Sequence, residues 1–339
     1  MSLVLSVLDQ SPVRSGGDAL DAINDTLELA RITERLGYHR YWLAEHHGTD
    51  GLAGCAPEIM IARVAAATSK MRIGSGGVML SHYSPLKVAE NFALLATMYP
   101  DRIDLGLGRA PGGDHMTTIA MQYGSEIGVE YYPTKVLDLK AFVTGSRPAN
   151  EALAKVKVTP RPPVPPQMWL LGSSAESAKL AATFGLPFSF AHFINPHGAR
   201  QVIADYKNDF QPSDILKEPQ ASMCVGAVCA ETQEAADRLA LSRGLWRVML
   251  EKGALGPYPT PEEAEAYPYT PLEKRIAERS KSTAIIGNPE TVRRGIEHTA
   301  KEHGVNEMMI VTICHDFAAR AKSYELIADE FGLKRRAAA

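Results

Sequence analysis

The sequence has little of several features that would place it in a specialised class of protein. Cysteine occurs four times in 339 residues, at Cys55, Cys224, Cys229 and Cys314. No two of them have a metal-binding spacing, so we expect free, buried thiols and no metal site. The formal net charge is only −3, with both signs spread along the chain, which argues against nucleic acid or an anionic membrane as the main partner.

Long apolar runs and targeting signals are also missing. No stretch reaches the roughly 18 uninterrupted apolar residues that a membrane-spanning helix needs. The first ten residues contain no basic segment followed by an apolar core and a cleavage site, so we expect a cytoplasmic protein. No glycine-rich fingerprint follows the first apolar run, where Asp9-Gln10-Ser11-Pro12 stands instead. This disfavours an open, doubly wound nucleotide-binding sheet.

What the chain does have is a regular alternation of short apolar runs with longer amphipathic segments. Strict alternation predicts a parallel sheet with right-handed crossovers. Eight repeats favour closure into a (β/α)8 TIM barrel, and residues 1–339 are expected to form this one domain. The predicted strands are Leu3–Leu8, Tyr38–Ala44, Met71–Leu80, Arg102–Gly108, Gln167–Leu171, Pro187–Ala191, Gln220–Ala230 and Glu307–Ile313.

Two segments do not fit the alternation and are predicted insertions. One covers residues 110–132 after the fourth strand, and the other covers 253–303 after the seventh, including a predicted helix at Pro289–Glu302. Long insertions on a barrel serve as lids or subunit contacts, or form passive surface.

Candidate functional residues lie where the strands end, because a β/α barrel builds its active site at the C-terminal ends of its strands. Glu45-His46-His47 follows the second strand. Adjacent strand residues point to opposite faces, so the two histidines do not chelate one metal. Either one histidine faces the barrel mouth as an acid or base with Glu45 anchoring it, or the residues form a structural hydrogen-bonded pair.

Two other patterns favour a phosphorylated, planar ligand. Gly74, Gly76 and Gly77 interrupt the third strand, which indicates either a close ligand or a plain bulge. Gly172-Ser173-Ser174 leads into a helix whose first turn contains Ser177, and Arg109 ends the neighbouring strand. Free N–H groups, hydroxyls and an arginine suit a phosphate, although one serine would also serve as a helix cap.

These motifs, in this order, resemble the bacterial luciferase-like flavin monooxygenases, in their non-bioluminescent branch. The match runs through Trp42–His47, Ile73–Val78, Gly106–Arg109, Trp169–Ser174 and Val311–Asp316. The resemblance implies a two-component enzyme that uses O2 and FMN, supplied as FMNH2 by a separate NAD(P)H:flavin reductase. A small organic substrate would be oxygenated through a flavin C4a-hydroperoxide.

The resemblance also implies roles for single residues. His46 matches the catalytic histidine, and Glu45 matches a residue near the flavin ring. Gly76-Gly77 falls at a cis peptide behind the ring. Arg109, Ser173, Ser174 and Ser177 match the phosphate ligands, with Gly172 in the same turn, and His192 takes a ring-side position. Gly108 stands where luciferase has a reactive cysteine, which argues against light emission.

Two other functions stay open on the same barrel: a deazaflavin-dependent hydride-transfer oxidoreductase, and a non-catalytic flavin-binding protein. The substrate is not specified by any motif. The resemblance further implies a homodimer formed through the second and third helices. Ala62, Ala65, Ala66 and Ala67 give the second helix a small-residue face that suits close packing, either between subunits or within one chain.

Overall fold

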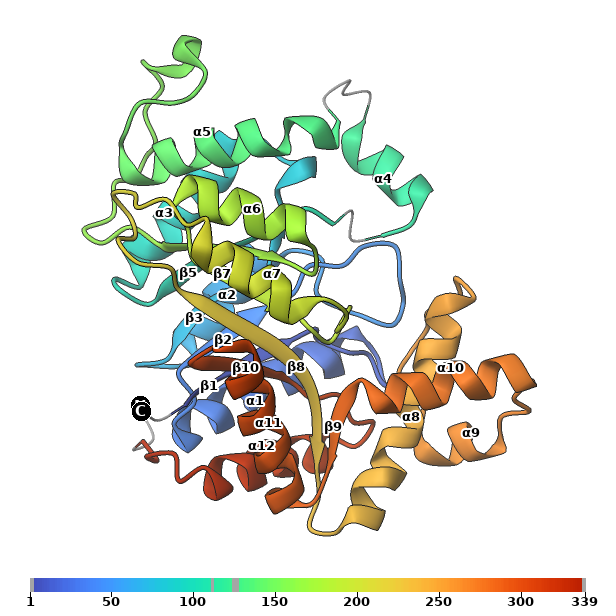
Figure 1. Cartoon of the computed structure of the whole chain (residues 1–339). Helices are drawn as coiled ribbons and strands as arrows, with labels where there is room; N and C mark the ends of the chain where they lie inside the picture. Colours follow the sequence, from blue (N-terminus) through green and yellow to red (C-terminus); the bar gives the residue numbers. More distant parts are fainter. Residues whose placement is uncertain (1–2, 111–112, 124–127, 337–339) are drawn as a thin grey trace.

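Eight parallel strands close into a ring, with the helices on its outside (Figure 1). The computed structural model describes residues 3–110, 113–123 and 128–336. The ring closes because β10 pairs with both β1 and β8, and the (β/α)8 prediction is confirmed. The ring strands are β1 (Val4–Asp9), β2 (Arg40–Leu43), β3 (Arg72–Ser75), β5 (Ile103–Gly108), β6 (Gln167–Gly172), β7 (Phe188–Ala191), β8 (Ala221–Cys229) and β10 (Glu307–Val311).

The predicted third strand, Met71–Leu80, is divided in two. After β3 the peptide bond between Gly76 and Gly77 is cis, and the strand resumes as β4 (Val78–Met79), which pairs with β5. A 3-10 turn, η1 (Leu80–His82), then replaces the predicted strand end. The glycine-rich segment therefore is a true interruption of the barrel wall.

The helices begin and end at residues with a local reason to do so. Asp18 accepts a hydrogen bond from the backbone of Asp21 at the start of α1, and Gly37 ends that helix with a φ of 93°, which glycine adopts without strain. The helices that cover the ring are α1 (Ala19–Leu36), α2 (Pro57–Ala66), α3 (Pro85–Met98), α5 (Tyr132–Thr144), α6 (Ala175–Phe184), α7 (Ala199–Asn208), α8 (Gln233–Glu251), α11 (Pro289–His303) and α12 (Phe317–Glu330).

Both predicted insertions contain additional structure. The first holds α4 (His115–Gln122) and η2 (Val129–Tyr131). The second holds α9 (Pro261–Ala266), α10 (Pro271–Ser282) and a strand that the sequence did not predict, β9 (Ala284–Gly287). β9 pairs with the end of β8, while α9 and α10 pack on α8 to one side of the ring (Figure 1). A further turn, η3 (Glu151–Leu153), precedes β6.

A buried polar network fills the N-terminal end of the barrel. Arg40 contacts Asp104 and Glu307, each at 2.7 Å. Asp104 also accepts hydrogen bonds from Arg72 at 2.8 Å and from the Trp42 indole at 2.9 Å. Burial alone raises the pKa of Asp104, but Arg40 and Arg72 outweigh burial and lower that pKa below its usual value. The network joins four ring strands by charge rather than by apolar packing.

The expectation of buried, free thiols is confirmed for three of the four cysteines and is wrong for the fourth. Cys224, Cys229 and Cys314 are buried free thiols, but Cys55 is exposed, because it precedes α2 in a surface loop and contributes nothing to the core. Within residues 3–110, 113–123 and 128–336, no helix is both long and apolar enough to cross a membrane.

We predict that Asp104→Asn lowers the free energy of unfolding by about 3 kcal/mol at neutral pH, because it removes one partner of a buried ion pair. The folded-state pKa of Asp104 is depressed, so the wild type loses this stabilisation as the pH falls through that pKa. The difference in unfolding free energy between the wild type and Asp104→Asn should therefore shrink. Urea denaturation measures both effects. Glu151→Gln, in an exposed ion pair with Arg147, should cost less than about 1 kcal/mol. Equal losses in the two variants would contradict the prediction.

Candidate active site

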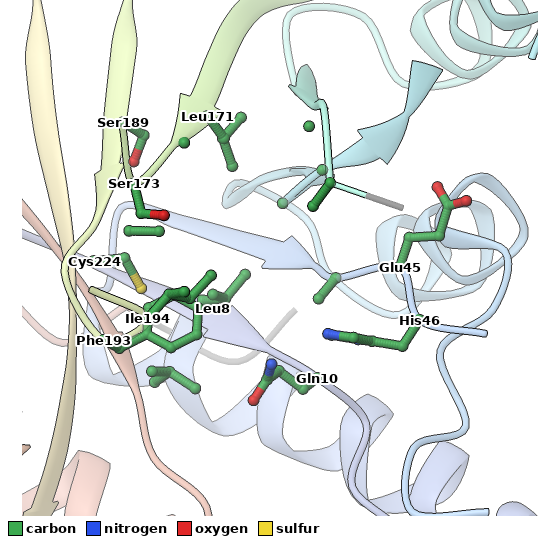
Figure 2. Close-up of a pocket in the computed structure, with 18 of the residues that line it drawn as sticks. Leu8, Gln10, Glu45, His46, Leu171, Ser173, Ser189, Phe193, Ile194 and Cys224 are labelled. Carbon is green, nitrogen blue, oxygen red and sulfur yellow. The ribbon is translucent and has the colours of Figure 1, made fainter. Parts of the chain in front are cut away.

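A cavity of about 550 Å³ opens at the C-terminal ends of the ring strands. Its floor is apolar and is formed by inward-facing side chains of the barrel, among them Leu8, Trp42, Met309 and Val311. Polar side chains from the strand ends surround this floor (Figure 2). The cavity has the size of a small-molecule or cofactor site, roughly 300–1,000 Å³.

Gly76 and Gly77 form one wall of the cavity with bare backbone. A Cβ atom on Gly76 would lie 2.6 Å from a Leu8 methyl, and one on Gly77 would lie 2.8 Å from the carbonyl oxygen of Gly106. Neither position therefore accepts a side chain without displacing its neighbours. The glycines break the strand and also line the cavity, while a closely bound ligand stays a prediction.

His46 directs its ring into the cavity (Figure 2). Its backbone N–H donates to the Gly54 carbonyl at 2.8 Å, which anchors the residue. Its Nδ1 atom is buried and has no hydrogen-bond partner in the described part of the chain. Burial, with a smaller contribution from His47, lowers the pKa of His46 to about 4. The imidazole is thus neutral at physiological pH.

Glu45 points away from His46 in Figure 2, and its carboxylate is already fully engaged. It accepts hydrogen bonds from the Tyr83 hydroxyl at 2.7 Å and from the Met79 backbone at 3.0 Å. The His47 ring lies 2.8 Å from the same carboxylate. The hydrogen-bonded pair is therefore Glu45–His47, while His46 faces the mouth. Glu45 holds β4 in place beside the glycines and is a positioning residue in this geometry.

The predicted phosphate-binding residues come together at the ends of β5 and β6. Arg109, Gly172, Ser173, Ser174 and Ser177 all line the cavity, and the Ser173 hydroxyl points into it (Figure 2). A Cβ atom at Gly172 would lie 2.5 Å from the Ser177 side chain. This glycine therefore lets the strand end approach the first turn of α6.

Two members of this group also have structural partners. Ser174 is the N-cap of α6, with its hydroxyl 3.5 Å from the Ser177 backbone nitrogen. Arg109 forms an ion pair with Glu176, in which the arginine side chain is 30% and the glutamate 64% exposed. An ion pair this exposed is weak, so an anion entering the cavity can compete with Glu176 for the guanidinium.

His192 does not line the cavity. The chain turns directly after β7, with the His192 N–H bonded to the Phe190 carbonyl at 3.1 Å. The His192 ring packs instead against His303, with 5.7 Å between ring centroids. Phe193 and Ile194 line the cavity next to it (Figure 2). At this end of β7, Phe193 and Ile194 line the cavity in place of His192.

Several cavity residues were not predicted from the sequence. Gln10 follows β1 and lines the cavity, whereas its neighbour Asp9 is buried in an ion pair with Arg320. Arg243 and Trp246 reach the cavity from α8, and Ser280 reaches it from α10. The position of Gln10 at a strand end could have identified it as a cavity residue. No sequence pattern indicates which helix residues reach the cavity. No group of three or more metal-binding side chains occurs among the residues described.

Comparisons with known proteins agree with the fold and show the family. The family model for luciferase-like monooxygenases matches residues 1–307, and the chain belongs to this family. It is 41% identical to the uncharacterized protein YceB of Bacillus subtilis (strain 168), over 96% of this chain and 99% of that one. It is 36% identical to the N-acetyl-S-alkylcysteine monooxygenase of the same organism, over 96% and 97%. The crystal structure of apo-MsnO8 superposes with a TM-score of 0.90 at 38% identity, covering 98% of this chain and 100% of MsnO8.

More distant structures share the fold alone. The oxygenating constituent of 3,6-diketocamphane monooxygenase from Pseudomonas putida, in complex with FMN, is 18% identical with a TM-score of 0.71, and the alignment covers 99% and 100% of the two chains. An F420-dependent secondary alcohol dehydrogenase is 17% identical with a TM-score of 0.72, covering 98% and 99%. The same barrel therefore occurs in a protein that binds FMN and in one that depends on F420.

We predict that the His46 imidazole titrates with a midpoint near pH 4, because burial disfavours its charged form. Histidine ring signals in an NMR pH titration measure the midpoint, and the spectrum of His46→Gln assigns the His46 signal. A midpoint near the ordinary value of about 6.5 would show that water solvates the ring freely.

Proposed function

We propose that this protein is a two-component monooxygenase that binds FMNH2 and uses O2 to oxygenate a small organic substrate. The observation that carries the proposal is the juxtaposition, in one cavity, of bare glycine backbone, an arginine–serine anion site and an uncharged histidine. Family membership supports the reaction class. Bound FMNH2 would supply the electrons for oxygen activation, and a separate NAD(P)H:flavin reductase would supply FMNH2.

The residues present fit a phosphorylated flavin. Arg109, Ser174 and Ser177 would hold the phosphate, with Gly172 permitting their close approach. Ser173 adds a hydroxyl and the N-terminus of α6 adds a favourable dipole. The backbone at Gly76 and Gly77 offers a flat surface against which a planar ring can lie, since no side chain stands in the way.

His46 would act on the reacting atoms as a neutral acid–base group. Its unpartnered Nδ1 can accept a proton, or donate one in the other tautomer. Glu45 would keep β4 and the glycines in register through the Met79 backbone. The apolar floor around Leu8 and Trp42 would exclude water from the reacting centre.

We also infer that the protein forms a homodimer through α2 and α3. Ala65 of the predicted small-residue face is buried within the chain, but Ala66 is exposed. Nearby, Ile59 of α2 and Leu94 and Met98 of α3 are exposed apolar side chains. Their burial between two subunits would be favourable, and the molecular mass in solution tests this.

Arg109→Ala should weaken FMN binding roughly tenfold or more while leaving riboflavin binding almost unchanged, because it removes a charged hydrogen-bond donor to the phosphate. Fluorescence titration with both flavins measures the difference. Glu176→Gln is the matched control, since removal of the competing carboxylate should preserve or strengthen FMN binding. Equal loss of both flavins in Arg109→Ala would place the phosphate elsewhere.

The activity itself is tested by mixing the protein–FMNH2 complex with oxygenated buffer and following flavin absorbance and oxygen consumption. We expect the protein to slow the return of oxidised flavin relative to free FMNH2, with oxygen consumed. FMNH2 that neither binds nor changes its rate of oxidation would overturn the proposal. Reduction of a carbonyl probe by a reduced deazaflavin without oxygen uptake would instead identify the hydride-transfer enzyme.

His46→Ala should retain FMN affinity within about twofold but lower product formation at least roughly a hundredfold, as expected for loss of an acid–base group. N-acetyl-S-methylcysteine is the first substrate probe, chosen from the name of the Bacillus relative. Because the His46 pKa is about 4, this residue should cause no change in rate between pH 6 and 8, about two units or more above that pKa. If His46→Ala formed product at the wild-type rate, the acid–base role of His46 would be excluded. The histidine would then have a merely structural role.

A further inference from the structure

Arg243 reaches into the barrel mouth from α8. The side chains of β8 alternate, and Cys224 lines the cavity, so position 226 also faces inward. Gly226 has no side chain there, and a Cβ atom at this position would lie 3.4 Å from both terminal guanidinium nitrogens of Arg243. The guanidinium therefore occupies space that the glycine leaves above β8, on the inner face of the barrel.

Among the residues that the structure describes, the charge of Arg243 has no counter-ion. Its Nε donates to the Ser280 carbonyl at 3.2 Å, and no carboxylate of the described residues lies within ion-pair distance. Burial lowers the pKa of Arg243, with Tyr258 and Arg247 as the ionisable neighbours that act on it, yet arginine stays protonated. Arg247 itself pairs with Glu251 at 3.0 Å. Arg243 is partly exposed, and a cation that lacks a carboxylate partner in such a position is open to an entering anion.

The cavity wall on one side of Arg243 is apolar. The cavity wall near β8 and β10 is formed by Cys224, Met309, Val311 and Ile313. Trp246, one helical turn on, is held by a hydrogen bond from its indole to the Gly256 carbonyl at 2.9 Å. Arg247 also lines the cavity but pairs with Glu251. The charge of Arg243 beside this apolar wall suits a molecule with an apolar body and one anionic group.

This charge is separate from the candidate phosphate site. Arg109 ends β5, and the three serines follow β6, whereas Arg243 lies over β8, with β7 between β6 and β8 in the ring. Arg109 also has Glu176 as a partner, so it needs no further anion in the absence of ligand. Two anion sites in one cavity fit a cofactor and a substrate that are both negatively charged.

We propose that Arg243 binds the carboxylate of the substrate, which makes the substrate class a small organic acid with an apolar portion. This inference rests on the proposed function for the role of the second molecule in the cavity. The planar guanidinium pairs with a carboxylate through two parallel hydrogen bonds. The apolar portion would then lie along the wall of Met309 and Val311, facing the side of the cavity that holds His46.

The test uses matched acids and amides on the full chain with no flavin added. The probes are N-acetyl-S-methylcysteine and octanoate, each compared with its primary amide, and tryptophan fluorescence reports binding because Trp246 lines the cavity. We expect at least one acid to bind roughly tenfold or more tightly than its amide. Arg243→Gln should abolish that preference, and Arg243→Lys should retain part of it.

Arg238→Gln is the matched control, because Arg238 lies on the same helix but pairs at the surface with Glu262 and Glu265. It should keep the wild-type preference. The inference is overturned if the wild-type protein binds the acids no better than the amides, or does not bind the acids at all. This comparison needs no variant, so it holds even if the variants do not fold. Selective loss of FMN but not riboflavin in Arg243→Gln would also overturn it, by assigning Arg243 to the cofactor phosphate. Failure of FMNH2 to bind would instead reject the proposed function and leave the acid–amide comparison intact.

Discussion

The buried contacts of Asp104 are the constraint on which the rest of the structure depends. This carboxylate, fully buried in the barrel, ties together Arg40, Arg72 and the Trp42 indole. The indole ring of Trp42 packs edge-on against Trp169, with 5.4 Å between centroids, and both rings belong to the apolar cluster beneath the cavity. The charges at one end of the barrel thereby hold the two aromatic rings that close the floor of the site at the other end.

That floor explains why glycine lines the cavity wall. Gly76 lies directly against Leu8 and Trp42, and Gly77 lies against the backbone of Gly106. Glu45 secures the next segment by accepting a hydrogen bond from Met79. Three of the polar groups that line the cavity carry the proposals: the His46 imidazole, the arginine–serine group around Arg109, and Arg243. Each has a different charge environment, which suits three different parts of a cofactor–substrate pair.

Most of the fold could be predicted because its signals are local. Alternation of apolar runs placed all eight ring strands, and Asp18 and Gly37 marked the ends of α1 through their own side-chain and backbone chemistry. β9 was missed because its four residues become a strand only by pairing with β8. His192 lies outside the cavity lining because a turn follows β7 at once and redirects the chain. Arg243 was missed because its role depends on the space above Gly226, a residue seventeen positions earlier and on another element.

By itself, the sequence determined the barrel, the strand ends at which polar side chains gather, and, through the resemblance, the family. These depend on periodicity and on neighbouring residues, which a chain carries in its order. Only the tertiary structure decided that Glu45 pairs with His47 while the His46 ring faces the cavity. It also decided that Arg109 has a carboxylate partner, whereas Arg243 has none among the described residues. Such differences come from burial and from contacts between distant segments, because the surroundings of a charge are set by packing and not by its position along the chain.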